Sequence, residues 1–171
     1  MFWENIFWLK VIILSLLQIF SLRRIRYPQI IVLEHKADEV SEIEFILEAC
    51  QPYIGIAMVA GAAAPQIERL PGNGFAALNF DDKAVLNLKE RTRARVITFG
   101  FDDGADLKIS NFIHNSSFKL IYGGTAVPVA AKNIFGRDEA YAAATAACVG
   151  LIFDLNLVEI SEAIQNSNWV K

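Results

Sequence analysis

The sequence predicts an α/β domain with a mainly parallel sheet, flanking helices and a small antiparallel strand region, preceded by an apolar N-terminal helix. Short continuous apolar runs such as Ile30–Leu33 and Ile54–Val59 are typical of strands buried on both faces of a parallel sheet. Helical patterns separate these runs, as connections between parallel strands require. From residue 105 to residue 131 the pattern changes to short alternating strands, which indicates antiparallel pairing.

The predicted strands are short, and turn residues separate several of them. Leu70–Gly74 is a turn by composition, Gly61–Pro65 is a loop or a short turn, and Gly123–Gly124 suits a hairpin turn. The expected strands are Ile30–Leu33, Ile54–Val59, Phe75–Asn79, Arg95–Phe99, Asp106–Phe112, Phe118–Tyr122 and Ala126–Ala130.

The predicted helices begin at capping residues. Ser41 and Glu44 have capping-box spacing, Asp81 and Asp82 suit a helix N-terminus, and Asp138 can cap an alanine-rich helix. The expected helices are Ser41–Ala49, Lys83–Thr92, a third from Asp138 to about Leu151, and Leu157–Gln165.

Composition excludes several classes of protein. Of 171 residues, 54% are apolar and 20% are charged, which excludes a disordered chain. A mass of 19.0 kDa is enough for one domain with a core. The net charge of −3 gives no electrostatic footprint for nucleic acid, so no such partner is expected. Cys50 and Cys148 make neither a disulfide scaffold nor a metal-binding spacing, which favours the cytoplasm.

Residues 1–26 are expected to form a separate apolar or amphipathic helix with a basic end, followed by one domain over residues 27–171. Phe2–Leu22 has the length of a membrane span, but polar residues interrupt it. A packed helix, a helix on the membrane surface and a membrane anchor all remain open. Arg23, Arg24 and Arg26 follow the apolar run, which argues against a signal peptide. A spanning helix would leave the domain at the cytoplasmic face, by the positive-inside rule.

Glu34 is the candidate metal ligand. It closes a predicted parallel strand, and ligands of open α/β sheets bind beyond the carboxyl ends of strands. A carboxylate at that place can hold Mg²⁺ beside a phosphate, or it can simply face water or cap a helix. The acidic pairs Asp81–Asp82 and Asp102–Asp103 could also hold a metal ion, but helix caps and turns explain them more simply. The sequence contains no GxxxxGK[ST], GxGxxG, HExxH, CxxC or GxSxG motif, so no catalytic or cofactor-binding residue is assigned.

Several segments, taken in order, carry a resemblance to a known family. Tyr27–Glu34 reads YPQIIVLE, Leu78–Asp82 reads LNFDD, and Thr92–Gly100 reads TRARVITFG. Phe135–Arg137 opens the alanine-rich helix. In this order they resemble the ATP-binding central domain of the Mur ligases, especially the ligase that adds D-alanyl-D-alanine to the UDP-muramoyl tripeptide.

The resemblance implies an ATP-dependent amide-bond ligase of peptidoglycan precursor synthesis. Such enzymes phosphorylate a carboxylate with ATP and Mg²⁺, and an amine then attacks the acyl phosphate. The implied partners are UDP-muramoyl peptide and D-alanyl-D-alanine. Glu34 matches the Mg²⁺-binding glutamate of the family.

Departures from the family pattern predict that the chain is not catalytic alone. The P-loop of the family would precede Met1 and its carboxyl-terminal domain would follow Lys171, so a truncated relative is expected. Ala60–Ile67 lacks the histidine and the carbamylated lysine of the family. In the adenine-contacting element, Asp138 and Glu139 replace a His-Asn pair, and Ala142 replaces a second asparagine. We therefore expect a remnant or fragment with doubtful ATP binding. The alternatives are a non-enzymatic membrane-associated module and one half of a split ligase.

Overall fold

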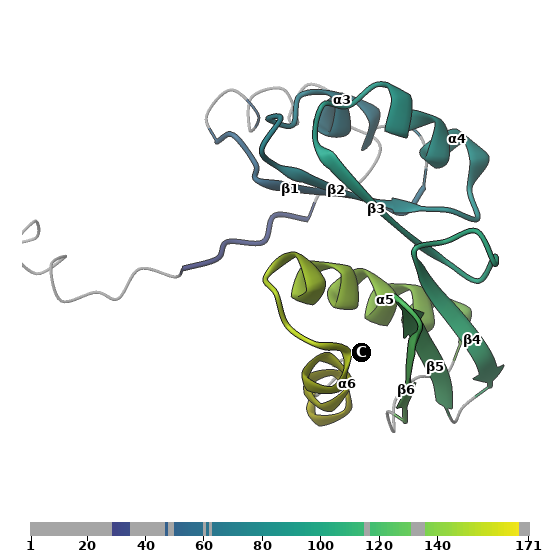
Figure 1. Ribbon diagram of the computed structural model, residues 1–171. Helices are drawn as coiled ribbons and strands as arrows, with labels where there is room; N and C mark the ends of the chain where they lie inside the picture. Colours follow the sequence, from purple (N-terminus) through teal and green to yellow (C-terminus); the bar gives the residue numbers. More distant parts are fainter. Residues whose placement is uncertain are drawn as a thin grey trace, which may run out of the picture. The chain divides into compact units, whose positions relative to one another are not determined.

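The computed structural model describes residues 29–34, 47, 50–59, 61, 63–114, 117–130 and 136–167. The chain divides into two compact units, Met1–Glu34 and His35–Lys171. The second unit holds all the helices and strands named below (Figure 1). Phe2–Leu22 lies outside the described residues, as does Ser41–Ala49 apart from Leu47, which is helical. Among the described residues, no helix has the length and apolarity that crossing a membrane requires.

Within the described part of the second unit, six strands form one sheet in chain order. The first four are parallel, and the last three pair antiparallel, with β4 common to both regions. This arrangement confirms the predicted mainly parallel sheet with a small antiparallel region. The strands are β1 (Ile54–Ala57), β2 (Phe75–Asn79), β3 (Arg95–Gly100), β4 (Leu107–Ile113), β5 (Ser117–Tyr122) and β6 (Thr125–Val129).

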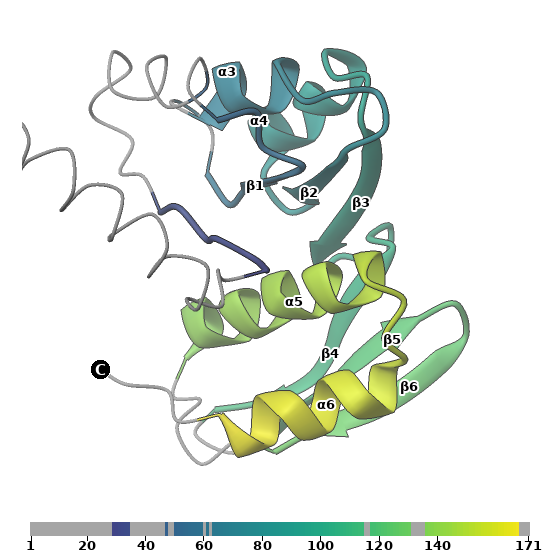
Figure 2. The ribbon, with the colours of Figure 1, turned by 90° about the vertical axis from the view of Figure 1, so that its left-hand side faces the viewer.

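Helices cover both faces of the parallel region. Helices α3 and α4 pack on one face of β1–β3, and α5 lies on the other face (Figures 1 and 2). Helix α6 packs against β6 and α5. The described helices are α3 (Ala63–Glu68), α4 (Lys83–Leu86), the 3₁₀ helix η1 (Asn87–Glu90), α5 (Arg137–Ile152) and α6 (Leu157–Asn166).

The alternation of side chains along β2 divides the core in two. Ala76 and Leu78 pack with Ile67 and Val85 beneath α3 and α4. Ala77 points to the opposite face and belongs to the core that α5 covers. Because successive strand residues point to opposite faces, this continuous apolar strand serves both cores.

Helix α5 packs on the sheet through small side chains. The side chains of α5 that face the core are four alanines and Cys148, and all of them are fully buried. Gly150, in the last turns of α5, lies so close to α6 that an added Cβ would stand 2.8 Å from Ile160 Cγ1. The alanine-rich sequence therefore sets how closely α5 approaches its neighbours. The buried α5 residues are Ala140, Ala143, Ala144, Ala147 and Cys148.

The predicted strand Ile30–Leu33 is wrong for this structure. These residues adopt no regular secondary structure, and their side chains are 58%, 72%, 83% and 62% exposed. The described sheet contains six strands and Ile30–Leu33 is not one of them. An apolar run indicates only a preference for burial. A strand forms only where a neighbouring strand pairs with its backbone N–H and C=O groups.

Other predictions differ from the structure at element boundaries. The helix expected over Lys83–Thr92 ends at Leu86 and continues as η1, since 3₁₀ turns are frequent at helix ends. Helix α3 begins inside the expected loop, with Pro65 in its first turn, where proline costs no hydrogen bond. The N-cap of α5 is Gly136 rather than Asp138.

The predicted hairpin and the predicted cap at Asp82 are confirmed. Gly123 and Gly124 have φ of 55° and 81° and join β5 to β6 in a two-residue turn. Asp82 caps α4, because its side chain accepts hydrogen bonds from the N–H groups of Ala84 and Val85.

Candidate functional site

The turn after β2 brings a carboxylate to the carboxyl end of β3. Asn79 ends β2, donates from Nδ2 to the Met58 carbonyl oxygen at 3.0 Å, and accepts from Asp81 N–H at 3.1 Å. Asp81 then turns toward β3 and accepts from Phe101 N–H at 2.7 Å and from Asp102 N–H at 2.9 Å. The local sequence thus fixes the Asp81 carboxylate at the end of two parallel strands.

Gly100 makes this close approach possible. A Cβ at this position would lie 2.7 Å from Asp81 Oδ1 and 2.8 Å from Asp81 Cγ. The carboxylate occupies the space that any larger residue would fill, so the end of β3 requires glycine beside Asp81.

Helix α5 completes the site from the other side. Tyr141 donates its hydroxyl to Asp81 Oδ2 at 2.6 Å. The Arg137 guanidinium carbon lies 4.1 Å from the Phe101 ring centroid, in cation–π geometry. The Phe101 and Tyr141 rings meet edge to face, with centroids 5.1 Å apart. We call Asp81, Phe101, Arg137 and Tyr141 the Asp81 cluster.

The electrostatics of the cluster fix its protonation. Burial alone would raise the pKa of Asp81, but hydrogen bonds from Phe101, Tyr141 and Asp102 and the charge of Arg137 outweigh it, so the pKa lies below the ordinary value. Burial and the Asp81 carboxylate raise the pKa of Tyr141, against the opposing influence of Arg137. Asp81 is therefore anionic and Tyr141 neutral at neutral pH, which suits a structural anion rather than a proton-transfer pair.

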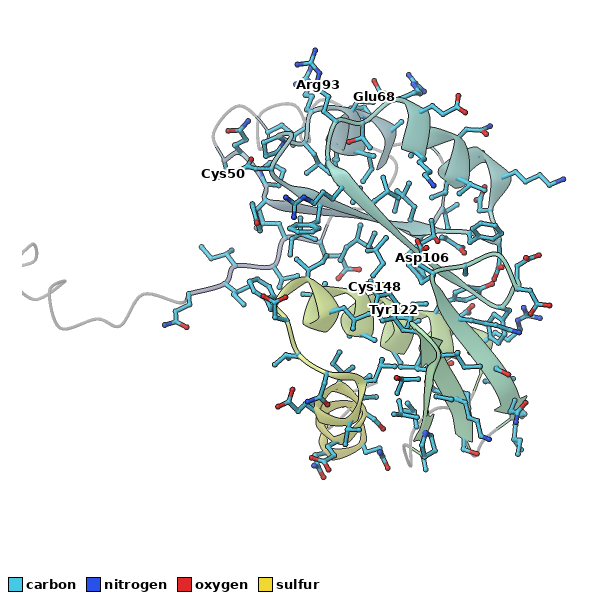
Figure 3. All side chains as sticks on the ribbon, in the orientation of Figure 1. Cys50, Glu68, Arg93, Asp106, Tyr122 and Cys148 are labelled. Atoms are coloured by element: carbon cyan, nitrogen blue, oxygen red, sulfur yellow. The ribbon has the colours of Figure 1, made fainter. Side chains whose placement is uncertain are left out.

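A second polar group joins β3 to β4. Thr98 donates from N–H and hydroxyl to Asp106 Oδ2, at 2.8 and 2.7 Å, and its hydroxyl accepts from Asp106 N–H at 2.9 Å. Cys148 of α5 lies near Asp106 (Figure 3). Burial, and then the Asp106 charge, raise the pKa of the Cys148 thiol. Cys148 is thus a neutral core residue rather than a nucleophile.

The candidate residues of the sequence fall at different places. Glu34 is exposed and belongs to the first compact unit, so its role as a metal ligand stays a prediction. Glu139 accepts from Gly136 N–H at 2.9 Å, which closes the first turn of α5. Asp138 and Ala142 are exposed. Among the residues that the structure describes, no three or more His, Cys, Asp or Glu side chains gather where they could hold a metal ion.

Asp82 caps α4, and Asp102–Asp103 lie in a turn, as predicted. Asp102 accepts from Gly104 N–H at 2.9 Å within a turn, and Asp103 pairs with Lys108. Asp81 instead anchors the cluster. Sequence reasoning missed Arg137 and Tyr141, although their spacing of four places both on one helix face.

The architecture matches solved Mur ligases. MurF from Thermotoga maritima, solved in complex with ADP, superposes with a TM-score of 0.64 at 12% identity, over 78% of this chain and 35% of that chain. This is the fold of the Mur ligase central domain. A D-alanyl-D-alanyl ligase from Acinetobacter baumannii gives 0.60 at 17% identity, over 71% of this chain and 30% of its own. A pseudomurein peptide ligase type C from Methanothermus fervidus gives 0.55 at 14% identity, over 75% and 37%.

The match to the Mur ligase fold covers only part of each ligase, roughly a third of the length of those solved chains. No family model matches the sequence. The similarity therefore establishes the fold of the described domain.

Proposed function

We propose that this chain is a Mur-type relative of the ATP-dependent amide ligases in which the adenine-contacting element has become a structural contact, so that the chain does not catalyse ligation alone. The observation that carries the proposal is the state of the first turns of α5. Glu139 is bonded to Gly136 N–H, Arg137 covers Phe101, and Tyr141 is bonded to Asp81.

The chemistry of these positions supports a loss of adenine recognition. An amide side chain can donate to and accept from the adenine edge at once, whereas an ionised carboxylate only accepts. The resemblance places amides where this chain has Glu139 and Ala142. The Glu139 carboxylate is already engaged at 2.9 Å, and a methyl group at Ala142 makes no hydrogen bond. Neither position offers the paired donor and acceptor that adenine requires.

A magnesium step is not part of the proposal. Glu34 is exposed, and one carboxylate does not make a Mg²⁺ site, which takes several oxygen ligands. Among the described residues, no group of three or more candidate metal-binding side chains stands together. The ancestral reaction would join D-alanyl-D-alanine to a UDP-muramoyl tripeptide. In this chain we assign to the retained fold a role other than ligation.

Calorimetric titration with ATP and Mg²⁺ tests the proposal. We expect no saturable heat up to about 1 mM nucleotide, a concentration at the upper end of typical KM values. MurF from Thermotoga maritima, whose solved structure contains ADP, serves as the positive control under the same conditions. A micromolar dissociation constant for this chain, or ATP turnover with a muramoyl peptide, would contradict the proposal.

A second candidate function is a non-enzymatic module at the cytoplasmic face of the membrane. The apolar run Phe2–Leu22, followed by Arg23, Arg24 and Arg26, favours it. Loss of ATP binding is compatible with this function. Cell fractionation tests it: a protein that stays in the soluble fraction, and whose distribution is unchanged by deletion of residues 2–22, would contradict membrane association.

A further inference from the structure

Three arginines face outward at the amino end of β3. Along residues 91–95, Arg91, Arg93 and Arg95 are exposed, whereas the residues between them turn inward. Thr92 donates its hydroxyl to the Ile67 carbonyl oxygen at 2.8 Å, and Ala94 is only 9% exposed. The inward residues hold the segment against the core, and the arginines therefore share the outer side.

The backbone under these arginines is fixed. Arg91 N–H donates to the Leu88 carbonyl oxygen at 3.0 Å, and Arg95 N–H donates to the Gly74 carbonyl oxygen at 3.0 Å. Phe75 N–H in turn donates to the Tyr53 carbonyl oxygen at 2.9 Å. The segment thus lies at the amino ends of the parallel strands, the opposite end from the Asp81 cluster.

The positive charge of this segment is only partly neutralised. The Arg91 guanidinium is 2.6 Å from Glu68 Oε1, and its side chain is 59% exposed. Arg95 lies over the Phe75 ring, 5.6 Å from its centroid, a contact that leaves the charge in place. Arg93 makes no ion pair with any described residue, and Figure 3 shows its side chain pointing away from the sheet. Among the described residues, neither Arg93 nor Arg95 has an ion-pair partner, although the chain as a whole has a net charge of −3.

An exposed aromatic side chain extends this surface. The Tyr53 ring meets Phe75 edge to face, with centroids 5.7 Å apart, and 50% of the residue is exposed. Phe75 thus links Tyr53 to Arg95. Tyrosine is enriched at membrane–water interfaces, where its ring lies at the level of the lipid headgroups.

We propose that Tyr53, Arg91, Arg93 and Arg95, here called the arginine strip, dock on an anionic lipid surface. Arginine binds phosphate oxygens through paired N–H donors, and each basic residue near an anionic bilayer contributes about 1 kcal/mol. One weak contact does not hold a protein at a membrane, so a second is needed. Phe2–Leu22 and the arginines after it can supply that second contact, which is why a bilayer is favoured over nucleic acid or an acidic protein.

Co-sedimentation of the full chain with vesicles tests the arginine strip. The probe is an equal mixture of phosphatidylglycerol and phosphatidylcholine, compared with phosphatidylcholine alone. For Arg93→Gln/Arg95→Gln we expect about a 30-fold fall in the partition coefficient, which corresponds to about 1 kcal/mol for each arginine. Lys83→Gln/Lys119→Gln removes the same charge at exposed positions elsewhere and should lose less than about 3-fold, because only charges close to the surface contribute strongly.

Further measurements make each outcome decisive. Thermal unfolding of both double variants establishes that they fold, and Arg93→Gln alone gives a milder test of the same surface. Wild-type binding should fall as salt rises from about 0.05 to about 0.5 M, because screening weakens surface charges. Equal losses in the two double variants would overturn the proposal. So would unchanged binding in Arg93→Gln/Arg95→Gln, which would assign attachment to Phe2–Leu22 alone. Arginine-dependent binding to RNA without binding to vesicles would overturn it as well. None of these results depends on whether the chain binds ATP.

Discussion

The Tyr141 hydroxyl lies 2.6 Å from Asp81 Oδ2 and donates a hydrogen bond to it, which joins α5 to the turn after β2 across 60 positions of the chain. The bond holds the first turns of α5 against the carboxyl end of the parallel strands. Because Asp81 also accepts two backbone N–H groups, its carboxylate is the common point of three segments. Substitutions at these residues test how much this arrangement contributes to the free energy of unfolding.

Tyr141→Phe should destabilise the fold by about 1 kcal/mol. Hydrogen bonds to charged groups contribute about 1.5–3 kcal/mol, and the exposure of Asp81 reduces that value. Urea unfolding followed by circular dichroism measures the change in the free energy of unfolding. Tyr122→Phe is the matched control, because Tyr122 is exposed and no hydrogen bond joins its hydroxyl to another described residue. Equal effects of the two substitutions would show that the Asp81 bond contributes nothing specific.

Asp81 should make stability depend on pH in the acid range. Its folded-state pKa lies below the ordinary value of 3.8, so between the two values the unfolded chain binds more protons than the folded chain. The stabilisation is therefore fully present above about pH 5 and is lost as pH falls through the folded-state pKa. Unfolding free energies of the wild type and Asp81→Asn, measured from pH 3 to pH 7, should converge toward acid pH. A difference that is constant over this range would contradict the lowered pKa.

Gly100→Ala should destabilise the fold by about 2 kcal/mol, in the range for overpacked sites. The new methyl group would stand 2.7 Å from Asp81 Oδ1 and displace the carboxylate from its three donors. In an Asp81→Ala background the space is empty, so the same substitution should cost less than about 1 kcal/mol. A double-mutant cycle by urea unfolding measures this coupling. Additive costs would show that Gly100 and Asp81 do not interact.

The two cysteines should differ in reactivity. Cys50 is exposed, whereas Cys148 is buried and its pKa is raised, so little thiolate forms there. With a thiol-specific disulfide reagent at about pH 8, near the ordinary thiol pKa, we expect one fast equivalent in the native protein and two after unfolding. Cys50→Ser should remove the fast phase. A fast phase that persists in this variant would place Cys148 within reach of solvent.

Elements with strong local determinants could be predicted from the sequence. Gly123–Gly124 supply the positive φ that a two-residue hairpin needs, and Asp82 supplies the cap of α4. Phe75–Asn79 has the predicted bounds in the structure. Each of these depends on residues within a few positions of one another. The exposed run Ile30–Leu33 could not be predicted in the same way, because pairing of a strand depends on a distant partner.

The sequence by itself determined the order of the six described strands, the change from parallel to antiparallel pairing and the resemblance to the Mur ligase central domain. The strand order and the change in pairing follow from local periodicity and turns, whereas the resemblance rests on the order of the matching segments. Only the tertiary structure decided that Asp81, Phe101, Arg137 and Tyr141 share one site, and that three arginines face outward beside Tyr53. Such sites join segments tens of residues apart. Side-chain periodicity gives the face on which a residue lies, but only the packing of helix on sheet determines which residue it contacts.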